Sequence, residues 1–182
     1  MRKKSHISLA CYIVSNTDNI ELKKHRFAFI FGSVLPDVKP SFLYRRHEIN
    51  GTFHDVKNAI VSLSDEKHSK QSSFRFFRDL GQVTHYLADY FTFPHNECYT
   101  GSLKDHCDYE EHLKKDLKKY LKEGLADFHC ANLLDLTSPE DIEAFILRKH
   151  EEYLEWADDV KTDIYNIVSV NLQTVKSILS TA

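Results

Sequence analysis

Apolar residues recur at spacings of three and four along almost the whole chain of 182 residues. This spacing places apolar side chains on one face of a helix, whereas a half-buried strand would alternate apolar and polar residues. The chain is also poor in the residues that interrupt helices, with 5 glycines and 4 prolines. The pattern therefore predicts an all-α fold, which we interpret as a single domain over residues 1–182 that forms a bundle of about seven helices.

Turn and capping residues suggest where these helices begin and end. Ser138 followed by Pro139 is typical of the first residues of a helix, and Gly32 with Pro36 is expected to end one. Residues 36–51 and 92–103 are expected to be mainly loop. The expected helices span His6 to about Ser15, Asn19 to Phe31, His54 to about Ser64, about Ser72 to Phe91, Lys104 to about Glu123, Pro139 to about Trp156, and about Val160 to Leu179.

Composition and charge exclude several classes of protein. With 42% apolar and 28% charged residues the chain is typical of a soluble globular protein, and its net charge of -3 predicts no dedicated nucleic-acid surface. No apolar run approaches the roughly 18 residues of a transmembrane segment.

The basic start "MRKKSHISLACYIV" has a short apolar run without a cleavage pattern, so we interpret it as a first helix and expect a cytoplasmic location. The cysteines (Cys11, Cys98, Cys107 and Cys130) are then expected to be reduced.

Polar residues interrupt one of the most apolar stretches, "LGQVTHYLADYFTFPHN", from Leu80 to Asn96. His85 and Asp89 are four residues apart, so a helix presents both on one face. His95 follows after a proline, where that helix must end. Because buried polar groups are costly unless they are paired, the stretch is either a metal-binding wall or a set of core residues with hydrogen-bond partners.

The same spacing recurs downstream, where His106 and Glu110 again place an imidazole and a carboxylate on one helical face. Asp37 in "GSVLPD", His54 in "GTFHD" and His6 in "KSHISLA" supply further candidates upstream. His47 in "YRRHEIN" is an alternative to His54. Histidine and carboxylate side chains are ligands that suit zinc. The candidate zinc ligands are thus His6, Asp37, His54, His85, Asp89, His95, His106 and Glu110.

The order of these blocks resembles the zinc-dependent phospholipase C family, whose fold is shared with the single-strand-specific nucleases of fungi and plants. The blocks are "SHISLACYIV", "GSVLPD", "GTFH", "LGQVTHYLADYFTFPHN" and "HCDYE", within roughly the first 110 residues. The resemblance implies an all-α domain that holds two, or three, zinc ions in a cleft. It also implies a small phosphate-ester or phospholipid substrate.

The resemblance further implies which residues hold each ion. One zinc would be bound by Asp37, His54, His85 and Asp89, and a second by His95, His106 and Glu110. A third would be bound by His6, with Asp89 as the bridge. In the family the mature N-terminal residue, usually a tryptophan, completes this third site through its amino and carbonyl groups. This chain has no tryptophan near its start, so the Met1 amine, water and another side chain stay open as substitutes.

Such a cluster predicts hydrolysis of phosphate esters, because zinc lowers the pKa of bound water to about 7 and offsets the charge that builds on a phosphoryl group. Asp37 is the side chain expected to orient or deprotonate that water. The aromatic residues Phe42, Tyr44, Phe91 and Phe93 fit three roles: a lipid-facing mouth, stacking on bases, or core packing.

Two other functions remain open from the sequence. The chain fits a non-catalytic helical binding module that zinc stabilises, because it is small and lacks the family's N-terminal tryptophan. It also fits an HD-type phosphohydrolase, in which His54 and Asp55 would act with His25 or His47 and with Asp89. The HD-type site leaves His95, His106 and Glu110 without a role.

Overall fold

The computed structural model of the chain describes residues 1–38, 47–65, 73–126 and 133–181, and these ranges contain helices and no strand. The all-α prediction is confirmed. The helices are α1 (Lys3–Ser15), α2 (Ile20–Lys24), α3 (Arg26–Val34), α4 (Ile49–Leu63), α6 (Ser73–Tyr90), the short 3-10 helix η2 (Phe93–His95), α7 (Leu103–Lys122), α9 (Pro139–Leu154) and α10 (Val160–Thr181).

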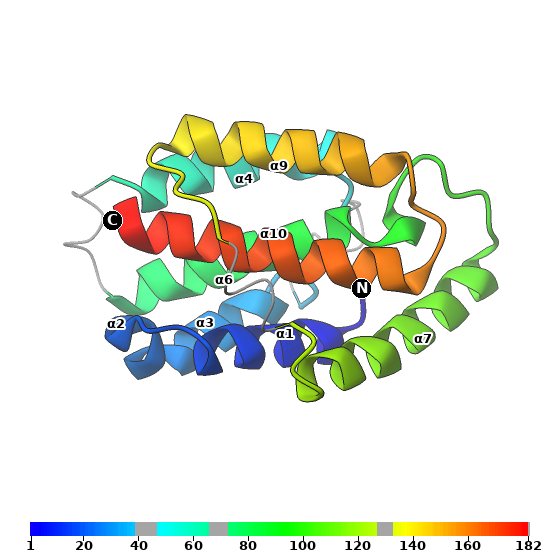
Figure 1. Cartoon of the computed structure of the whole chain (residues 1–182), viewed down its shortest axis with the longest axis horizontal. Coiled ribbons are helices and arrows are strands. Elements are labelled where there is room, and N and C mark those ends of the chain that lie inside the picture. Colours follow the sequence, from blue (N-terminus) through cyan, green and yellow to red (C-terminus); the bar gives the residue numbers. More distant parts are fainter. Residues whose placement is uncertain (39–46, 66–72, 127–132, 182) are drawn as a thin grey trace.

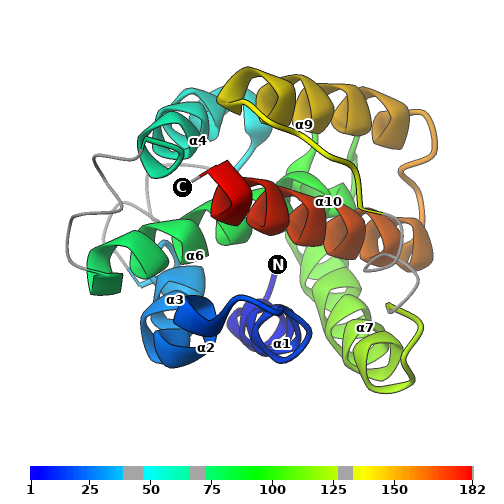
Figure 2. The ribbon, with the colours of Figure 1, turned by 60° about the vertical axis from the view of Figure 1, so that its left-hand side comes forward.

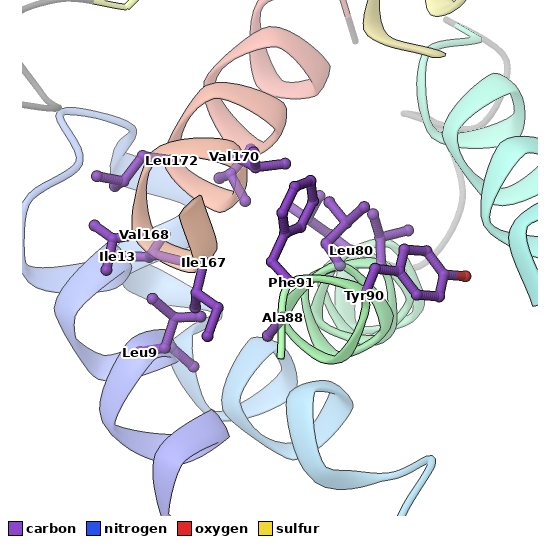
Figure 3. Close-up of a cluster of buried hydrophobic side chains, with 14 of the residues drawn as sticks. Leu9, Ile13, Leu80, Ala88, Tyr90, Phe91, Ile167, Val168, Val170 and Leu172 are labelled. Carbon is purple, nitrogen blue, oxygen red and sulfur yellow. The ribbon is translucent and has the colours of Figure 1, made fainter. Parts of the chain in front are cut away.

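Helix α6 lies at the centre of the bundle, with α1 and α3 on one side, α4 and α9 on the other, and α10 running across it (Figures 1 and 2). From Leu80 to Tyr90 all of its apolar residues except the half-buried Tyr86 are buried, as expected of a central helix. The part of the core drawn in Figure 3 is contributed by α1, α6 and α10, through Leu9, Ile13, Leu80, Ala88, Tyr90, Ile167, Val168, Val170 and Leu172.

Two glycines let the backbones of α3 and α6 touch. A Cβ atom at Gly32 would lie 1.9 Å from the carbonyl oxygen of Arg78, and one at Gly81 would lie 2.2 Å from the carbonyl oxygen of Phe29. Gly32 therefore serves close packing and does not end its helix, which continues to Val34. The predicted stop at Gly32 was wrong.

Other helix limits also differ from the predicted ones, and α1 begins at Lys3, three residues before the expected His6. The helix expected from Asn19 to Phe31 is divided at His25 into α2 and α3, and Asn19 caps α2 by accepting a hydrogen bond from the N–H of Leu22 at 2.8 Å. Helix α4 begins at Ile49, five residues before the expected start. The expected cap at Ser138 is present, with a capping box to Asp141.

Cys11, Cys98 and Cys107 are free and exposed, as expected of reduced cysteines, while Cys130 lies outside the described residues. Within the described ranges, no helix combines the length and the apolar character needed to cross a membrane.

Candidate metal centre

His85 and Asp89 lie on the buried face of α6, with 0% and 1% of their surface exposed. The Nδ1–H of His85 donates to the carbonyl oxygen of Ser33 at 2.8 Å, at the end of α3. The other ring nitrogen of His85, Nε2, lies 3.2 Å from Oδ2 of Asp89. A backbone carbonyl on the far nitrogen is the arrangement that orients metal-binding histidines.

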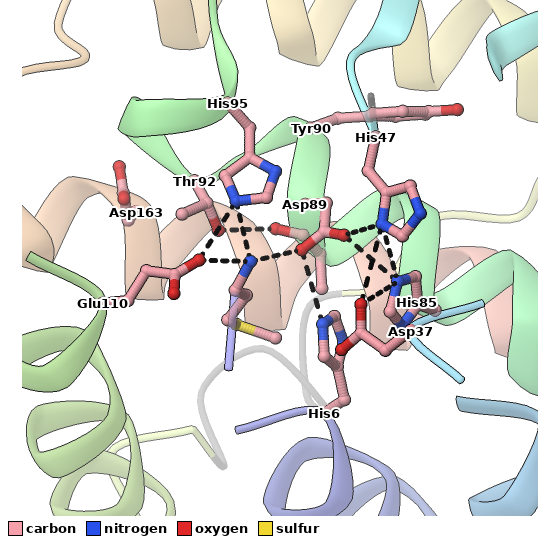
Figure 4. Close-up of polar contacts among 12 residues, drawn as sticks. His6, Asp37, His47, His85, Asp89, Tyr90, Thr92, His95, Glu110 and Asp163 are labelled. Carbon is pink, nitrogen blue, oxygen red and sulfur yellow. Dashed lines mark hydrogen bonds and ion pairs between the residues drawn. The ribbon is translucent and has the colours of Figure 1, made fainter. Parts of the chain in front are cut away.

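Asp37 and His47 complete a first group around these two residues (Figure 4). Nδ1 of His47 lies 2.8 Å from Oδ2 of Asp89 and 3.0 Å from Nε2 of His85. Oδ1 of Asp37 lies 3.7 Å from Nε2 of His85 and 3.9 Å from Nδ1 of His47. Asp37, His47 and His85 thus bring three potential ligand atoms together, and Asp89 contacts both histidines.

The structure brings His47, and not His54, to this group. His54 is exposed on α4, where its Nε2 lies 3.1 Å from Nδ2 of Asn58. Because α4 turns Val56 and Ile60 into the core, His54 projects from the opposite side of the helix. The expectation that His54 follows Asp37 in this group does not agree with the structure.

His95, His106 and Glu110 form a second group, as the sequence predicts. Nε2 of His95 and Nε2 of His106 each lie 3.2 Å from Oε1 of Glu110. Helix η2 supplies His95, and one face of α7 supplies the other two residues. The pair on α7 is partly buried and faces the cluster.

The amino group of Met1 lies between the two groups. It is buried and lies 2.7 Å from Oδ1 of Asp89, 2.8 Å from Nε2 of His95 and 3.0 Å from Oε1 of Glu110. From the sequence alone, this amine is one of several substitutes for the family's N-terminal ligand. Only the structure shows how near it comes to both groups.

His6 is 1% exposed, stacks on His85 with ring centroids 3.9 Å apart, and has Nε2 at 3.4 Å from Oδ1 of Asp89. Neither of its ring nitrogens has a hydrogen-bond partner within the described part of the chain. Unpaired buried nitrogens are rare, and a metal ion bound at Nε2 of His6 would account for one of the two. Oδ1 of Asp89 therefore faces His6 and Met1, while Oδ2 faces His47 and His85.

Burial and neighbouring charges favour the neutral form of His6 and His95. Burial, with His85 beside it, lowers the pKa of His6 to about 3. Burial and the Met1 ammonium group also lower the pKa of His95. Neutral imidazoles are the form that binds metal.

The pKa values of the three carboxyl groups, those of Asp89, Glu110 and Asp37, shift in different directions. Although burial acts in the opposite direction, the Met1 ammonium group and His95 hold the pKa of Asp89 well below its usual range. For Glu110, burial is likewise outweighed by the hydrogen bonds from His106 and His95, and its pKa is lowered. Burial raises the pKa of Asp37, so Asp37 is the most basic of the three.

Both groups open into a cleft of roughly 1250 Å³ that Asp37, His47, His95, His106 and Glu110 help to line. Four basic residues also line it, namely Arg2, Lys3, Lys4 and Lys114. Of the aromatic residues singled out in the sequence, Phe91 is buried in the core and Phe93 packs against Tyr99 and Tyr109. Phe42 and Tyr44 lie outside the described residues.

The donor atoms fit zinc. In the described ranges three sets of potential ligand atoms come together: His6, His85 and Asp89; Asp37, His47 and His85; and His95, His106 and Glu110. Each set consists of imidazole nitrogens and carboxylate oxygens, which zinc accepts in four-coordinate sites. His54 and Asp55, the HD dipeptide, are both exposed and belong to none of these sets.

Comparison with known proteins gives one match. A family model described as zinc dependent phospholipase C matches residues 5–160, a range that contains all the candidate ligands except Met1. No curated protein and no solved structure matches the chain.

Proposed function

The chain belongs to the zinc-dependent phospholipase C family, and from this premise we propose that it hydrolyses phosphate esters, phospholipids among them. The observation that supports the proposal most is the position of Asp89, whose two oxygens face different sets of nitrogen ligands. A bridging carboxylate of this kind serves a cluster of ions and not a single structural ion.

We assign the ligands from the distances. The first ion would be held by Asp37, His47, His85 and Asp89, and the second by His95, His106 and Glu110. A third would be held by His6, Asp89 and the Met1 amine. We therefore propose three zinc ions, one for each of these sets.

Bound zinc supplies Lewis-acid activation of water and offsets the negative charge of the phosphoryl group. Asp37 lines the cleft, and because burial raises its pKa, it is the carboxylate best suited to accept a proton from the attacking water. Lys3 and Lys4 at the wall of the cleft favour an anionic substrate. The cytoplasmic location stays a prediction.

The second candidate function is a non-catalytic module that zinc stabilises. Structural zinc sites are closed by four protein ligands, whereas catalytic sites keep a position for water. The group of His95, His106 and Glu110 has three side-chain ligands and opens into the cleft, and this observation favours the catalytic function.

The test combines zinc content with turnover. The wild type is expected to contain at least two zinc ions per chain and to cleave a chromogenic phosphodiester or a short-chain phospholipid. His85→Ala is expected to lose zinc and activity, and Asp37→Asn to lose more rate than zinc. His54→Ala is the matched control, since this histidine is exposed and outside the cluster.

Two outcomes would count against the proposal. Less than one zinc per chain after purification with zinc present contradicts the cluster. Full zinc with no turnover of phosphodiesters, phosphomonoesters or phospholipids contradicts the hydrolase and supports the binding module.

A further inference from the structure

Asp163 is a fully buried carboxylate of α10 that the proposed chemistry does not use. It receives three hydrogen bonds from different parts of the chain. Its Oδ2 accepts from the N–H of Phe93 at 2.9 Å and from the hydroxyl of Tyr109 at 3.0 Å, and its Oδ1 accepts from the hydroxyl of Tyr153 at 2.7 Å. Asp163 lies beyond the residues that the family model matches.

Two of these donors belong to the elements that carry the second group. Phe93 begins η2, two residues before His95, and Tyr109 immediately precedes Glu110 on α7. Figure 4 draws Asp163 on the side of the cluster where His95 and Glu110 lie. One carboxylate oxygen thus joins η2 to α7. In the described residues, none of the hydrogen bonds of this carboxylate goes to a candidate ligand.

The hydrogen bonds of Asp163 are expected to hold η2 and α7 in a fixed position relative to each other. A buried carboxyl group is costly unless its oxygens are hydrogen-bonded, so the three donors are held to it. The affinity of a site for zinc depends on the spacing of its ligands, and residues that orient ligands from outside typically contribute 10–100-fold to metal affinity. A shift of η2 relative to α7 would separate His95 from Glu110.

We infer that Asp163 is a positioning residue for the second group, holding η2 and α7 at the separation at which His95, His106 and Glu110 bind one ion. The inference rests on the proposed function only in that zinc binds this group. It extends the site to α10, which supplies none of the candidate ligands in the described residues.

Two tyrosines provide a matched pair of variants. Tyr109→Phe and Tyr153→Phe each remove one hydroxyl bonded to the same carboxylate. Tyr109 lies on α7 beside a candidate ligand, whereas Tyr153 lies on α9, which carries none of the candidate ligands. Tyr109→Phe and Asp163→Asn are expected to weaken zinc binding at the second group by roughly 10–100-fold. Tyr153→Phe is expected to change it less than about threefold, even where it lowers the Tm.

The measurement is a zinc titration of the full chain in competition with a chelator. The binding step that His106→Ala removes identifies the second group, and the step that His47→Ala removes identifies the first. The expected result is that Tyr109→Phe and Asp163→Asn weaken only the step identified by His106→Ala. If Asp163→Asn does not fold, Tyr109→Phe still carries the test.

The inference is overturned if all steps weaken together, if Tyr153→Phe weakens the second group as much as Tyr109→Phe, or if no variant changes it. A wild type without a step that His106→Ala removes overturns it as well. Because the titration needs no turnover, a protein that binds zinc and cleaves no phosphate ester would contradict the proposed function alone.

Discussion

Asp89 is the residue on which the whole cluster depends. Its Oδ1 lies 2.7 Å from the Met1 amine, and its Oδ2 lies 2.8 Å from Nδ1 of His47. It is 1% exposed, so water does not compete for these positions. A carboxylate in this place can be shared by two ions, whereas a carboxamide offers one acceptor oxygen and a donor that repels cations.

Asp89→Asn is therefore expected to lower the zinc content by at least one ion per chain and the rate of phosphodiester hydrolysis by roughly 100-fold or more. Elemental analysis and a chromogenic assay measure the two effects. Asp79→Asn is the control on the same helix, because Asp79 is partly exposed and bonds Arg78 and Gln82. Full zinc and full activity in Asp89→Asn would show that this carboxylate is no bridge.

Asp163 predicts a pH dependence of stability. Burial raises its pKa to about 7, although hydrogen bonds from Phe93, Tyr153 and Tyr109 act in the opposite direction. The folded state therefore keeps its proton to higher pH than the unfolded state, whose Asp has a pKa of about 3.9. The stability present below about pH 4 is lost as the pH rises towards 7, at up to about 1.4 kcal/mol per pH unit.

Urea unfolding at several pH values, with chelator present, measures this effect. The free energy of unfolding of the wild type should fall more steeply between pH 4 and 7 than that of Asp163→Asn, whose side chain does not titrate. Parallel curves for the two proteins would show that Asp163 is ionised throughout.

At the scale of helices, the contact between α3 and α6 decides whether His85 reaches its partner. A Cβ atom at Gly81 would lie 2.2 Å from the carbonyl oxygen of Phe29 and 2.8 Å from the nitrogen of Ser33, both of them backbone atoms. Gly81→Ala is expected to push the helices apart, to cost about 1–3 kcal/mol, and to move the carbonyl of Ser33 away from His85.

Equilibrium unfolding in urea and zinc content test this prediction. Gly101→Ala is the control, because a Cβ atom there meets only the side chain of Tyr99, which can move. Unchanged stability and zinc content in Gly81→Ala would mean that the two helices tolerate a wider spacing.

The helices follow from the spacing of apolar residues along the chain, so their existence and their i,i+4 pairs could be predicted from the sequence. Pairs such as His85 with Asp89 lie four residues apart, so the helix alone brings them together. The start of α4 was missed because Gly51 is a poor helix former. Contacts with other elements stabilise that first turn, including the bond between the hydroxyls of Thr52 and Tyr90 at 2.8 Å.

The choice between His47 and His54 could not be predicted either, because it depends on contacts between separate elements. His54 lies on a regular helix, but which of its faces meets α6 depends on tertiary packing. His47 lies just before α4, where no periodic pattern indicates the direction of a side chain. Its contact with Asp89 joins residues 42 positions apart, and spacing along the chain carries no information about such a contact.

At the scale of the whole molecule, the chain start lies inside the bundle. Figures 1 and 2 place the N end among α1, α7 and α10, and Met1 is 5% exposed. Although burial acts in the opposite direction, Asp89 and Glu110 raise the pKa of its amino group. The ammonium ion offsets the charge of these carboxylates, and in the proposed third site the neutral amine would be a ligand.

Adding residues before Met1 tests this arrangement. An extension such as Gly-Ser turns the amine into an amide, which binds zinc poorly, and forces extra chain into a buried position. We expect the extended protein to lose one zinc ion per chain and to hydrolyse phosphodiesters at least roughly 10-fold more slowly. The same two residues added after the last residue of the chain serve as the control.

Removal of the extension by a protease that regenerates the Met1 terminus should restore both zinc and rate, which separates loss of the ligand from irreversible misfolding. Equal zinc and equal rate in the extended protein would show that water or another side chain completes the third site. In that case the third site would keep His6 and Asp89, whose Nε2 and Oδ1 atoms lie 3.4 Å apart, without the Met1 amine.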